Sequence, residues 1–305
     1  MESSKPKTKI LVVVGPTASG KSALAVILAK KFGGEIISAD SRQIYKGLNI
    51  GTGKIRKEEM QGVLHHMISV ASPKKQYNAA RYQKEAQRAV IRIIRKNKLP
   101  IVCGGTGFYI DILLNKIPLT NVPPNNKLRK TLENKPPEEL FKILKKLDAK
   151  RAEKIDKNNP RRLIRAIEIA KSIGKVPAIT KEVDKYDAFF IGVYLKPDIL
   201  NKKIKSRLSK RIRQGMVAES EKLHKFGLSW KKMDALGLEY RFVSKFLQGK
   251  ITKEEMRTKL EIEIRKYAKR QMTWFRKNKS IRWFDISKKE ELERLEKEVL
   301  SYLRL

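Results

Sequence analysis

An eight-residue loop near the start of the chain constrains the fold more than any other feature. Residues 15–22 read GPTASGKS, which matches the pattern G-x-x-x-x-G-K-[ST], and they directly follow the apolar run Ile10–Val14. Where a buried strand ends in such a glycine turn and a helix begins, backbone N–H groups point outward and the helix dipole favours an anion. The pattern therefore predicts a polyphosphate site. A glycine turn without a ligand is the alternative.

Each part of this loop has a predicted task. The two glycines permit the tight turn, the lysine supplies positive charge to the outer phosphates, and the hydroxyl of Ser22 is placed to bind Mg²⁺. We expect the whole loop to take part in binding: Gly15, Pro16, Thr17, Ala18, Ser19, Gly20, Lys21 and Ser22.

Short apolar runs alternate with amphipathic helical patterns in the first half of the chain. Strands are predicted at Ile10–Val14, Glu35–Ser38 and Leu99–Cys103, and helices at Ser22–Phe32 and Tyr77–Lys98. Strands that alternate with helices indicate a parallel sheet with crossover helices. We therefore predict an α/β fold, with a P-loop NTPase-like, doubly wound parallel sheet.

Five prolines between residues 118 and 137 interrupt this alternation. From there to about Tyr186 the pattern is helical, with helices at Glu138–Leu147 and Arg161–Ile173. Beyond it we predict strands at Phe189–Leu195 and Ile281–Ile286 and helices near 198–214, 216–226, 238–248 and 252–278. The predicted organisation is a core formed by 1–117 and 187–305, with a small helical domain inserted at 118–186.

The charge of the chain points to a polyanionic partner. There are 70 Lys and Arg residues against 32 Asp and Glu, a net charge of +38. Between residues 257 and 282, ten basic and two acidic residues are interleaved with Tyr267, Trp274 and Phe275, with Trp283 just beyond. Because charge occurs together with rings on which bases can stack, this pattern favours RNA contact over dispersed solubilising charge.

The remaining composition indicates the compartment. A single cysteine, Cys103, excludes a disulfide framework and suggests a reducing environment. The N-terminal residues lack an apolar core of signal-peptide length, and no stretch reaches the roughly 18 apolar residues of a membrane span. We therefore expect a cytoplasmic protein without membrane contact, and a monomer is sufficient for the activity inferred below.

A carboxylate follows the second predicted strand. Asp40 comes nineteen residues after Lys21. Ligands of open α/β sheets bind outside the carboxyl ends of the strands, so Asp40 and the loop should face the same crevice. There Asp40 is placed to accept a proton. The alternative is that it only caps the turn Asp40-Ser41-Arg42.

Five segments resemble the tRNA dimethylallyltransferases. They are SADSRQIYKGLNIGTGK at 38–54, HHMIS at 65–69, LPIVCGGTGFY at 99–109, PRRLIRAIE at 160–168 and YAKRQMTWFR at 267–276. The resemblance runs in order from the loop almost to residue 285. It implies transfer of a dimethylallyl group from dimethylallyl diphosphate to the N6 amine of the adenine just 3′ of the anticodon, at tRNA position 37.

The resemblance also implies catalytic roles. Lys21, the loop amides and Mg²⁺ at Ser22 would neutralise the departing diphosphate, and Asp40 would accept the N6 proton. Arg207 matches an arginine that the family places near the diphosphate, and Lys54 is a second candidate for that task. The partner implied is a tRNA anticodon stem-loop, whose target base is flipped into a pocket.

Residues for tRNA binding are carried over by position. Ser41, Arg42 and Gln43 would line the base pocket with Asp40. Thr106, at a glycine-rich strand exit that lets backbone approach a ligand, would be a further contact in the core, and a plain tight turn is the alternative there. In the insertion, the segment at 161–165 would contact tRNA, with its arginines on the phosphates: Arg161, Arg162, Leu163, Ile164 and Arg165. A solvated helix face is the alternative reading of these arginines.

The chain departs from the family at three places. Arg42 stands where methionine is usual. Ser69 departs from the Ile/Leu-Asp pair that commonly follows the two histidines. The segment 237–241 reads GLEYR in place of Gly-Tyr-Lys-Glu. Two other functions fit the loop alone: a P-loop kinase for a small metabolite or nucleotide, and a non-catalytic RNA-binding NTPase.

Overall fold

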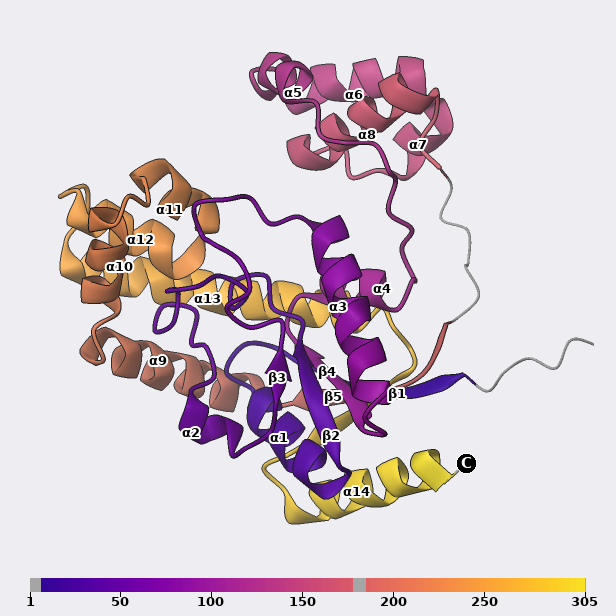
Figure 1. Cartoon of the computed structure of the whole chain (residues 1–305). Coiled ribbons are helices and arrows are strands. Elements are labelled where there is room, and N and C mark those ends of the chain that lie inside the picture. Colours follow the sequence, from indigo (N-terminus) through magenta and orange to yellow (C-terminus); the bar gives the residue numbers. More distant parts are fainter. Residues whose placement is uncertain (1–6, 178–184, 305) are drawn as a thin grey trace, which may run out of the picture. The chain divides into compact units, whose positions relative to one another are not determined.

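The computed structural model describes residues 7–177 and 185–304 (Figure 1). The chain divides into two compact units, which we call the core unit, Met1–Asn115 with Asp184–Leu305, and the helical unit, Lys116–Val183. The boundaries expected after residues 117 and 186 lie two and three residues from these. Residues 178–184, which we assigned to the insertion, lie outside the described part of the chain. The described part of that insertion consists of helices and loops, except for Tyr186, where β5 begins.

The core unit is built on a six-stranded sheet in which every pairing is parallel. The strand order is β3-β2-β4-β1-β5-β6, which confirms the predicted α/β class. The strands are β1 (Thr8–Val14), β2 (Gly34–Ser38), β3 (His65–His66), β4 (Leu99–Gly104), β5 (Tyr186–Tyr194) and β6 (Ile281–Asp285).

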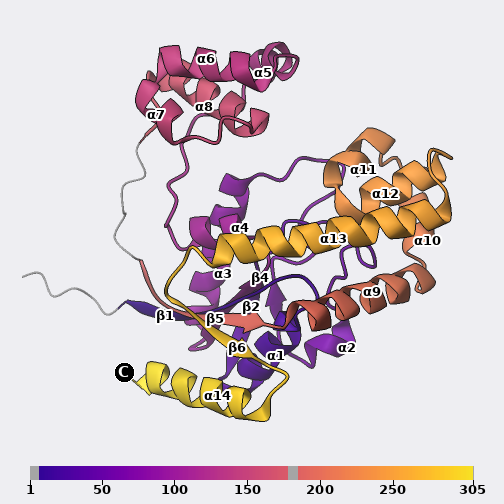
Figure 2. The ribbon, with the colours of Figure 1, turned by 180° about the vertical axis from the view of Figure 1, so that it is seen from behind.

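Helices cover both faces of this sheet (Figures 1 and 2). One face packs in a single apolar cluster against α1 (Lys21–Lys31) and α14 (Lys289–Arg304). The other face contacts α3 (Ala79–Ile94) and α4 (Gly107–Leu113). Because β1 is buried on both faces, it reads as a continuous apolar run, as central parallel strands do.

The C-terminal part of the core unit adds a helical layer. Figure 2 shows α13 running along this layer together with α9, which it contacts. Their shared apolar cluster includes Leu208 and Leu260. The helices of this part and the short one after β2 are α2 (Lys57–Met60), α9 (Pro197–Arg213), α10 (Met216–Lys225), α11 (Trp230–Leu236), α12 (Leu238–Leu247) and α13 (Lys253–Phe275).

The helical unit has a core of its own. Its buried residues come from each of its four helices, among them Leu132, Leu144, Ala152 and Leu163. The helices are α5 (Asn126–Glu133), α6 (Pro137–Leu147), α7 (Ala149–Lys154) and α8 (Pro160–Ile173). Proline occupies the first turn of α6 and of α8, where the missing N–H has no intrahelical partner to lose.

Candidate active site

The loop at 15–22 joins β1 to α1. Gly15 and Gly20 have φ angles of 152° and 98°, which side chains rarely adopt, and a Cβ on Gly15 would lie 2.9 Å from the Val193 carbonyl oxygen. The Lys21 ammonium donates to the Pro16 carbonyl at 3.2 Å, within the loop itself. Among the described residues the buried Ser19 hydroxyl has no hydrogen-bond partner. The loop therefore forms as predicted, with a polar group still to be satisfied.

A cavity of about 70 Å³ lies between this loop and the carboxyl ends of β2 and β4. Lys21, Asp40 and Arg207 all line it, together with Thr17 and Ser22. Residues that are 167 positions apart in sequence, from Asp40 to Arg207, thus meet at one place. The expectation that Asp40 and the loop face one crevice is borne out by this lining.

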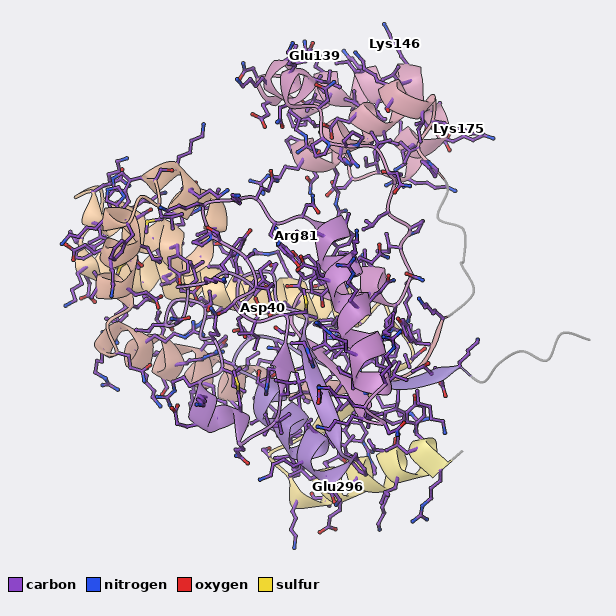
Figure 3. The ribbon with its side chains drawn as sticks, viewed as in Figure 1. Asp40, Arg81, Glu139, Lys146, Lys175 and Glu296 are labelled. Carbon is purple, nitrogen blue, oxygen red and sulfur yellow. The ribbon has the colours of Figure 1, made fainter. Side chains whose placement is uncertain are left out.

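Asp40 also holds its own turn. One carboxylate oxygen, Oδ1, accepts the backbone N–H groups of Arg42 at 2.8 Å and Gln43 at 3.3 Å. The described hydrogen bonds of Asp40 use only this oxygen. The turn-capping role that the sequence left as an alternative is therefore present, and Asp40, labelled in Figure 3, also lines the cavity.

Thr106 supports the same turn from the glycine-rich end of β4. Its hydroxyl accepts the Ser41 N–H at 3.1 Å, and its own N–H donates to the Ala39 carbonyl at 3.1 Å. A Cβ on Gly104 would lie 2.1 Å from that carbonyl oxygen, so only glycine permits the approach. Thr106 thus contacts the residue after Asp40, whereas its contact with tRNA stays a prediction.

Gln271 of α13 joins the two glycine-rich loops. Its side-chain oxygen accepts the Thr17 N–H at 2.8 Å, and its Nε2 donates to the Gly105 carbonyl at 2.9 Å. A Cβ on Gly105 would lie 2.1 Å from Nε2. No local pattern in the segment YAKRQ indicates this role of Gln271, because its two partners lie 254 and 166 residues away.

Two half-buried cations lie at this site, Lys21 within the loop and Arg207 across from it. Arg207 donates to the Gly53 carbonyl at 3.1 Å and to the Thr17 hydroxyl at 3.4 Å. Burial, followed by repulsion from Arg211, lowers the pKa of Arg207 to about 10, so it stays charged at neutral pH. Burial likewise lowers the pKa of Lys21. Among the described residues no carboxylate lies within ion-pair distance of either cation, which leaves both for an anion.

Lys54 is bound by its own chain. Its ammonium donates to the Tyr45 carbonyl at 2.6 Å and to the Ser69 hydroxyl at 2.8 Å, and burial lowers its pKa to about 8. It lines a second, larger groove of about 930 Å³ that also reaches Lys21, Arg207 and Arg211. Lys54 therefore connects the segments around Tyr45 and Ser69, and its contact with diphosphate stays a prediction.

Residues 161–165 of α8 divide into two groups. Arg161 and Arg162 are exposed, as a phosphate contact requires. Leu163 and Ile164 are 0% and 7% exposed and belong to the core of the helical unit. Their burial corrects the expectation that these two side chains contact tRNA. Arg165 pairs with Glu168 at 3.2 Å and donates to the Val122 carbonyl at 2.7 Å, so it also holds the unit together.

The aromatic rings near the C-terminus are mostly committed to the fold. Phe275 is 4% exposed, the Trp274 indole donates to Asp111 at 3.0 Å, and the Trp283 ring lies against Gly192. These contacts correct the idea that all of these rings are free to stack on bases. Tyr267 differs from them, because it lines the cavity beside Asp40.

A glycine-rich loop with its own lysine at the carboxyl edge of a parallel sheet, and a cavity that this loop shares with an acid and a second cation, define a protein of the P-loop class. The sequence model of one family, described as IPP transferase, matches residues 43–278. The chain belongs to this family.

Individual relatives agree with this assignment. The tRNA dimethylallyltransferase 2 of Treponema denticola is 44% identical over 276 residues, 89% of this chain and 92% of the relative. The solved structure of a full-length tRNA isopentenylpyrophosphate transferase from Bacillus halodurans is 35% identical with a TM-score of 0.70, covering 92% of this chain and 90% of that chain. A structure of a eukaryotic dimethylallyltransferase acting on tRNA has a TM-score of 0.76 at 28% identity, covering 91% and 74%. The resemblance seen in the motifs is thereby confirmed, and with it a prenyl-transferring enzyme.

Proposed function

We propose that this chain transfers the dimethylallyl group of dimethylallyl diphosphate to the N6 amine of adenine 37 in tRNA. The observation that carries the proposal is the shared cavity of Lys21, Arg207 and Asp40, because it places leaving-group cations beside a proton acceptor. The printed names of the relatives supply the substrate class, a tRNA.

The loop would bind the diphosphate. The outward N–H groups at the start of α1, the Lys21 ammonium and the Arg207 guanidinium offset the negative charge that grows on the leaving oxygen.

Mg²⁺ fits this donor set. The ion takes most of its ligands from phosphate oxygens and water and needs few from the protein. The exposed Ser22 hydroxyl at the start of α1 is one such ligand. The described residues contain no group of three or more His, Cys, Asp or Glu that could hold a metal without a substrate. Bound Mg²⁺ would supply charge neutralisation at the diphosphate.

Part of the cavity lining is apolar and would suit the hydrocarbon group. Alternate residues of a strand face the same side, and Ile36 and Ser38 of β2 line the cavity together with Asp40. One turn of α1 beyond Lys21, Ala25 lines it as well. Burial of the prenyl methyl groups there would keep the allylic carbon near the carboxylate and away from water.

Asp40 would act as the base. The N6 lone pair attacks the allylic C1, the C1–O bond breaks with its electrons on diphosphate, and the N6 proton passes to Asp40. The free carboxylate oxygen is the one that its turn does not use. The adenine must leave the loop stack to reach the cavity, at a modest cost because anticodon-loop bases are unpaired.

The test is an incubation with an unmodified anticodon stem-loop and labelled dimethylallyl diphosphate, with Mg²⁺. We expect label in N6-isopentenyladenosine at position 37, and none in a stem-loop with guanosine at that position. Parallel reactions with ATP separate the alternatives, since a kinase would phosphorylate a metabolite and an NTPase switch would show RNA-stimulated hydrolysis. Absence of label from the adenine substrate would refute the proposal.

A single copy of the chain provides every residue invoked, and we propose that it acts as a monomer in the cytoplasm. None of the helices in the described ranges is long and apolar enough to cross a membrane.

A further inference from the structure

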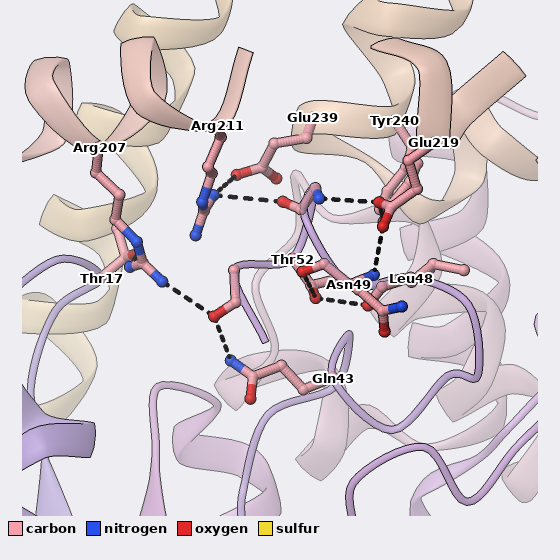
Figure 4. Close-up of polar contacts among 12 residues, drawn as sticks. Thr17, Gln43, Leu48, Asn49, Thr52, Arg207, Arg211, Glu219, Glu239 and Tyr240 are labelled. Atoms are coloured by element: carbon pink, nitrogen blue, oxygen red, sulfur yellow. Dashed lines mark hydrogen bonds and ion pairs between the residues drawn. The ribbon is translucent and has the colours of Figure 1, made fainter. Parts of the chain in front are cut away.

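The segment at 237–241, which departs from the family pattern, lies beside the active site. Glu239 accepts a hydrogen bond from Arg211, and Tyr240 donates one to Glu219. Both of these partners contact the loop 49–53 (Figure 4). This loop follows the Asp40 turn, and its Gly53 carbonyl receives the hydrogen bond of Arg207. The proposed chemistry gives neither residue a task.

Glu219 of α10 fixes the first half of that loop. Its carboxylate accepts three successive backbone N–H groups, from Asn49 at 2.9 Å, Ile50 at 2.7 Å and Gly51 at 3.0 Å. The Tyr240 hydroxyl donates to the same carboxylate at 2.9 Å. Burial raises the pKa of this hydroxyl well above its usual value, so it remains a donor throughout the physiological range.

Two glycines allow the loop to come this close. A Cβ on Gly51 would lie 2.7 Å from the Tyr240 hydroxyl oxygen. At Gly53, where φ is +56°, a Cβ would lie 1.8 Å from an Arg211 nitrogen and 2.3 Å from an Arg207 nitrogen. The motif Gly51-Thr52-Gly53 is therefore the surface on which both guanidinium groups rest.

The two arginines are one helical turn apart on α9 and repel each other. Arg211 is neutralised by Glu239 at 2.8 Å and also donates to the Gly51 carbonyl at 3.3 Å. Within residues 7–177 and 185–304, Arg207 has no such carboxylate partner, and its hydrogen bonds go to the neutral oxygens of Gly53 and Thr17. The charge of Arg211 is therefore balanced by Glu239, whereas the charge of Arg207, beside the phosphate loop, is not balanced by a carboxylate of the described residues.

We infer that Tyr240 and Glu219 are positioning residues for the leaving group, which hold loop 49–53 so that Arg207 faces the diphosphate. The inference rests on the proposed diphosphate site. It gives a role to Tyr240, one of the residues that depart from the family pattern. This residue bonds the carboxylate of Glu219 and lines neither of the two cavities described above. Loss of the Tyr240 hydroxyl would loosen the loop. Because Arg207 donates to the Gly53 carbonyl of this loop, the position of its guanidinium would then be less well fixed.

The experiment compares two tyrosine hydroxyls of the full-length protein. Tyr240→Phe removes the bond to Glu219. The matched control Tyr302→Phe removes a hydroxyl of α14 that donates to the Asp187 carbonyl and accepts the Ile10 N–H. Affinity for inorganic diphosphate with Mg²⁺ is measured by calorimetry, and Tm is recorded for each variant. Because no turnover is needed, the result is independent of whether tRNA is prenylated.

We expect Tyr240→Phe to weaken diphosphate binding about three- to tenfold, and Tyr302→Phe less than twofold even where it lowers Tm. Glu219→Gln should weaken it at least as much as Tyr240→Phe. In an Arg207→Ala background the Tyr240→Phe effect should shrink below about twofold, because coupled residues give non-additive losses. Equal losses in the two tyrosine variants, or an undiminished loss without Arg207, would overturn the inference.

Discussion

Asp40 uses one carboxylate oxygen for its own turn, at 2.8 and 3.3 Å from two backbone nitrogens. Deletion of the side chain would therefore remove a turn cap and a base at once. Asparagine separates the two tasks, because its amide oxygen still accepts the N–H groups of Arg42 and Gln43 but cannot take a proton at neutral pH. Asp40→Asn should thus keep the hydrogen bonds of the turn and remove the proton acceptor.

We predict that Asp40→Asn lowers turnover about 10²- to 10⁴-fold, the usual contribution of a general base. The affinity for the tRNA stem-loop should remain within about threefold of the parent, because the turn is kept. Single-turnover kinetics and equilibrium binding measure the two quantities. If Asp40→Asn were active and only Asp40→Ala inactive, the carboxylate would be a turn cap and no base.

At the scale of elements, sequence patterns predicted the longer elements and missed the short ones. Strands β1, β2, β4, β5 and β6 were predicted from short apolar runs, and the long helices from apolar residues that recur at helical spacing. The two-residue β3 and the short helices α2, α4, α5, α7 and α11 were not predicted, because they carry too few residues for a period to be visible. Asp40 was predicted from its place after a strand, whereas Gln271 and Glu219 act on backbone groups far away in sequence, which no local pattern encodes.

Gln271 connects α13 to both glycine-rich loops, and we predict a double effect of Gln271→Ala. The buried Thr17 N–H and Gly105 carbonyl lose their partner, which should cost about 1–3 kcal/mol of the free energy of unfolding. The KM for dimethylallyl diphosphate should rise, since the phosphate loop loses an anchor. Urea unfolding and steady-state kinetics measure these effects. The control Gln248→Ala, at the residue after α12, removes a bond to the Ser244 carbonyl and an exposed bond from Lys250. It should change stability by less than about 0.5 kcal/mol and leave KM unchanged.

Glu35 makes the β2–β3 edge sensitive to acid. Burial alone would raise the pKa of this carboxyl, but hydrogen bonds from His66, Lys98 and Lys96 outweigh burial and lower the pKa to about 2. Since the folded-state pKa lies below the unfolded value of about 4.5, the stabilisation is complete above pH 4.5 and is lost as pH falls toward 2.

We therefore predict that Glu35→Gln lowers stability by about 2 kcal/mol at pH 7, and that its Tm deficit narrows steadily below pH 4.5. Thermal unfolding between pH 7 and pH 3 measures this trend. Glu296→Gln breaks an exposed pair with Lys31 and should show a small deficit across that range. A Glu35→Gln deficit independent of pH would contradict the assignment of the stabilisation to the charged carboxylate.

On the scale of the whole molecule, a charge of +38 allows many contacts with an RNA backbone, and the question is which basic residues make them. The exposed Arg161 and Arg162 at the start of α8 are predicted tRNA contacts, in contrast to Arg165, which is paired with Glu168. Lys145 and Lys146, exposed at the end of α6, carry equal charge in the same unit (Figure 3). A comparison of Arg161 and Arg162 with Lys145 and Lys146 therefore separates direct phosphate contacts from the overall positive charge of the helical unit.

Each neutralised phosphate contributes about 0.7 to 0.9 to the slope of log K against log salt concentration. We predict that Arg161→Ala with Arg162→Ala lowers the magnitude of that slope for tRNA binding by about 1.4 to 1.8, whereas Lys145→Ala with Lys146→Ala changes it by less than about 0.5. Diphosphate affinity should be unchanged in both, because the phosphate loop belongs to the core unit. Filter binding between 50 and 300 mM salt measures the slopes. Equal slopes for the two double variants would show that tRNA responds to the total charge of the helical unit and not to the start of α8.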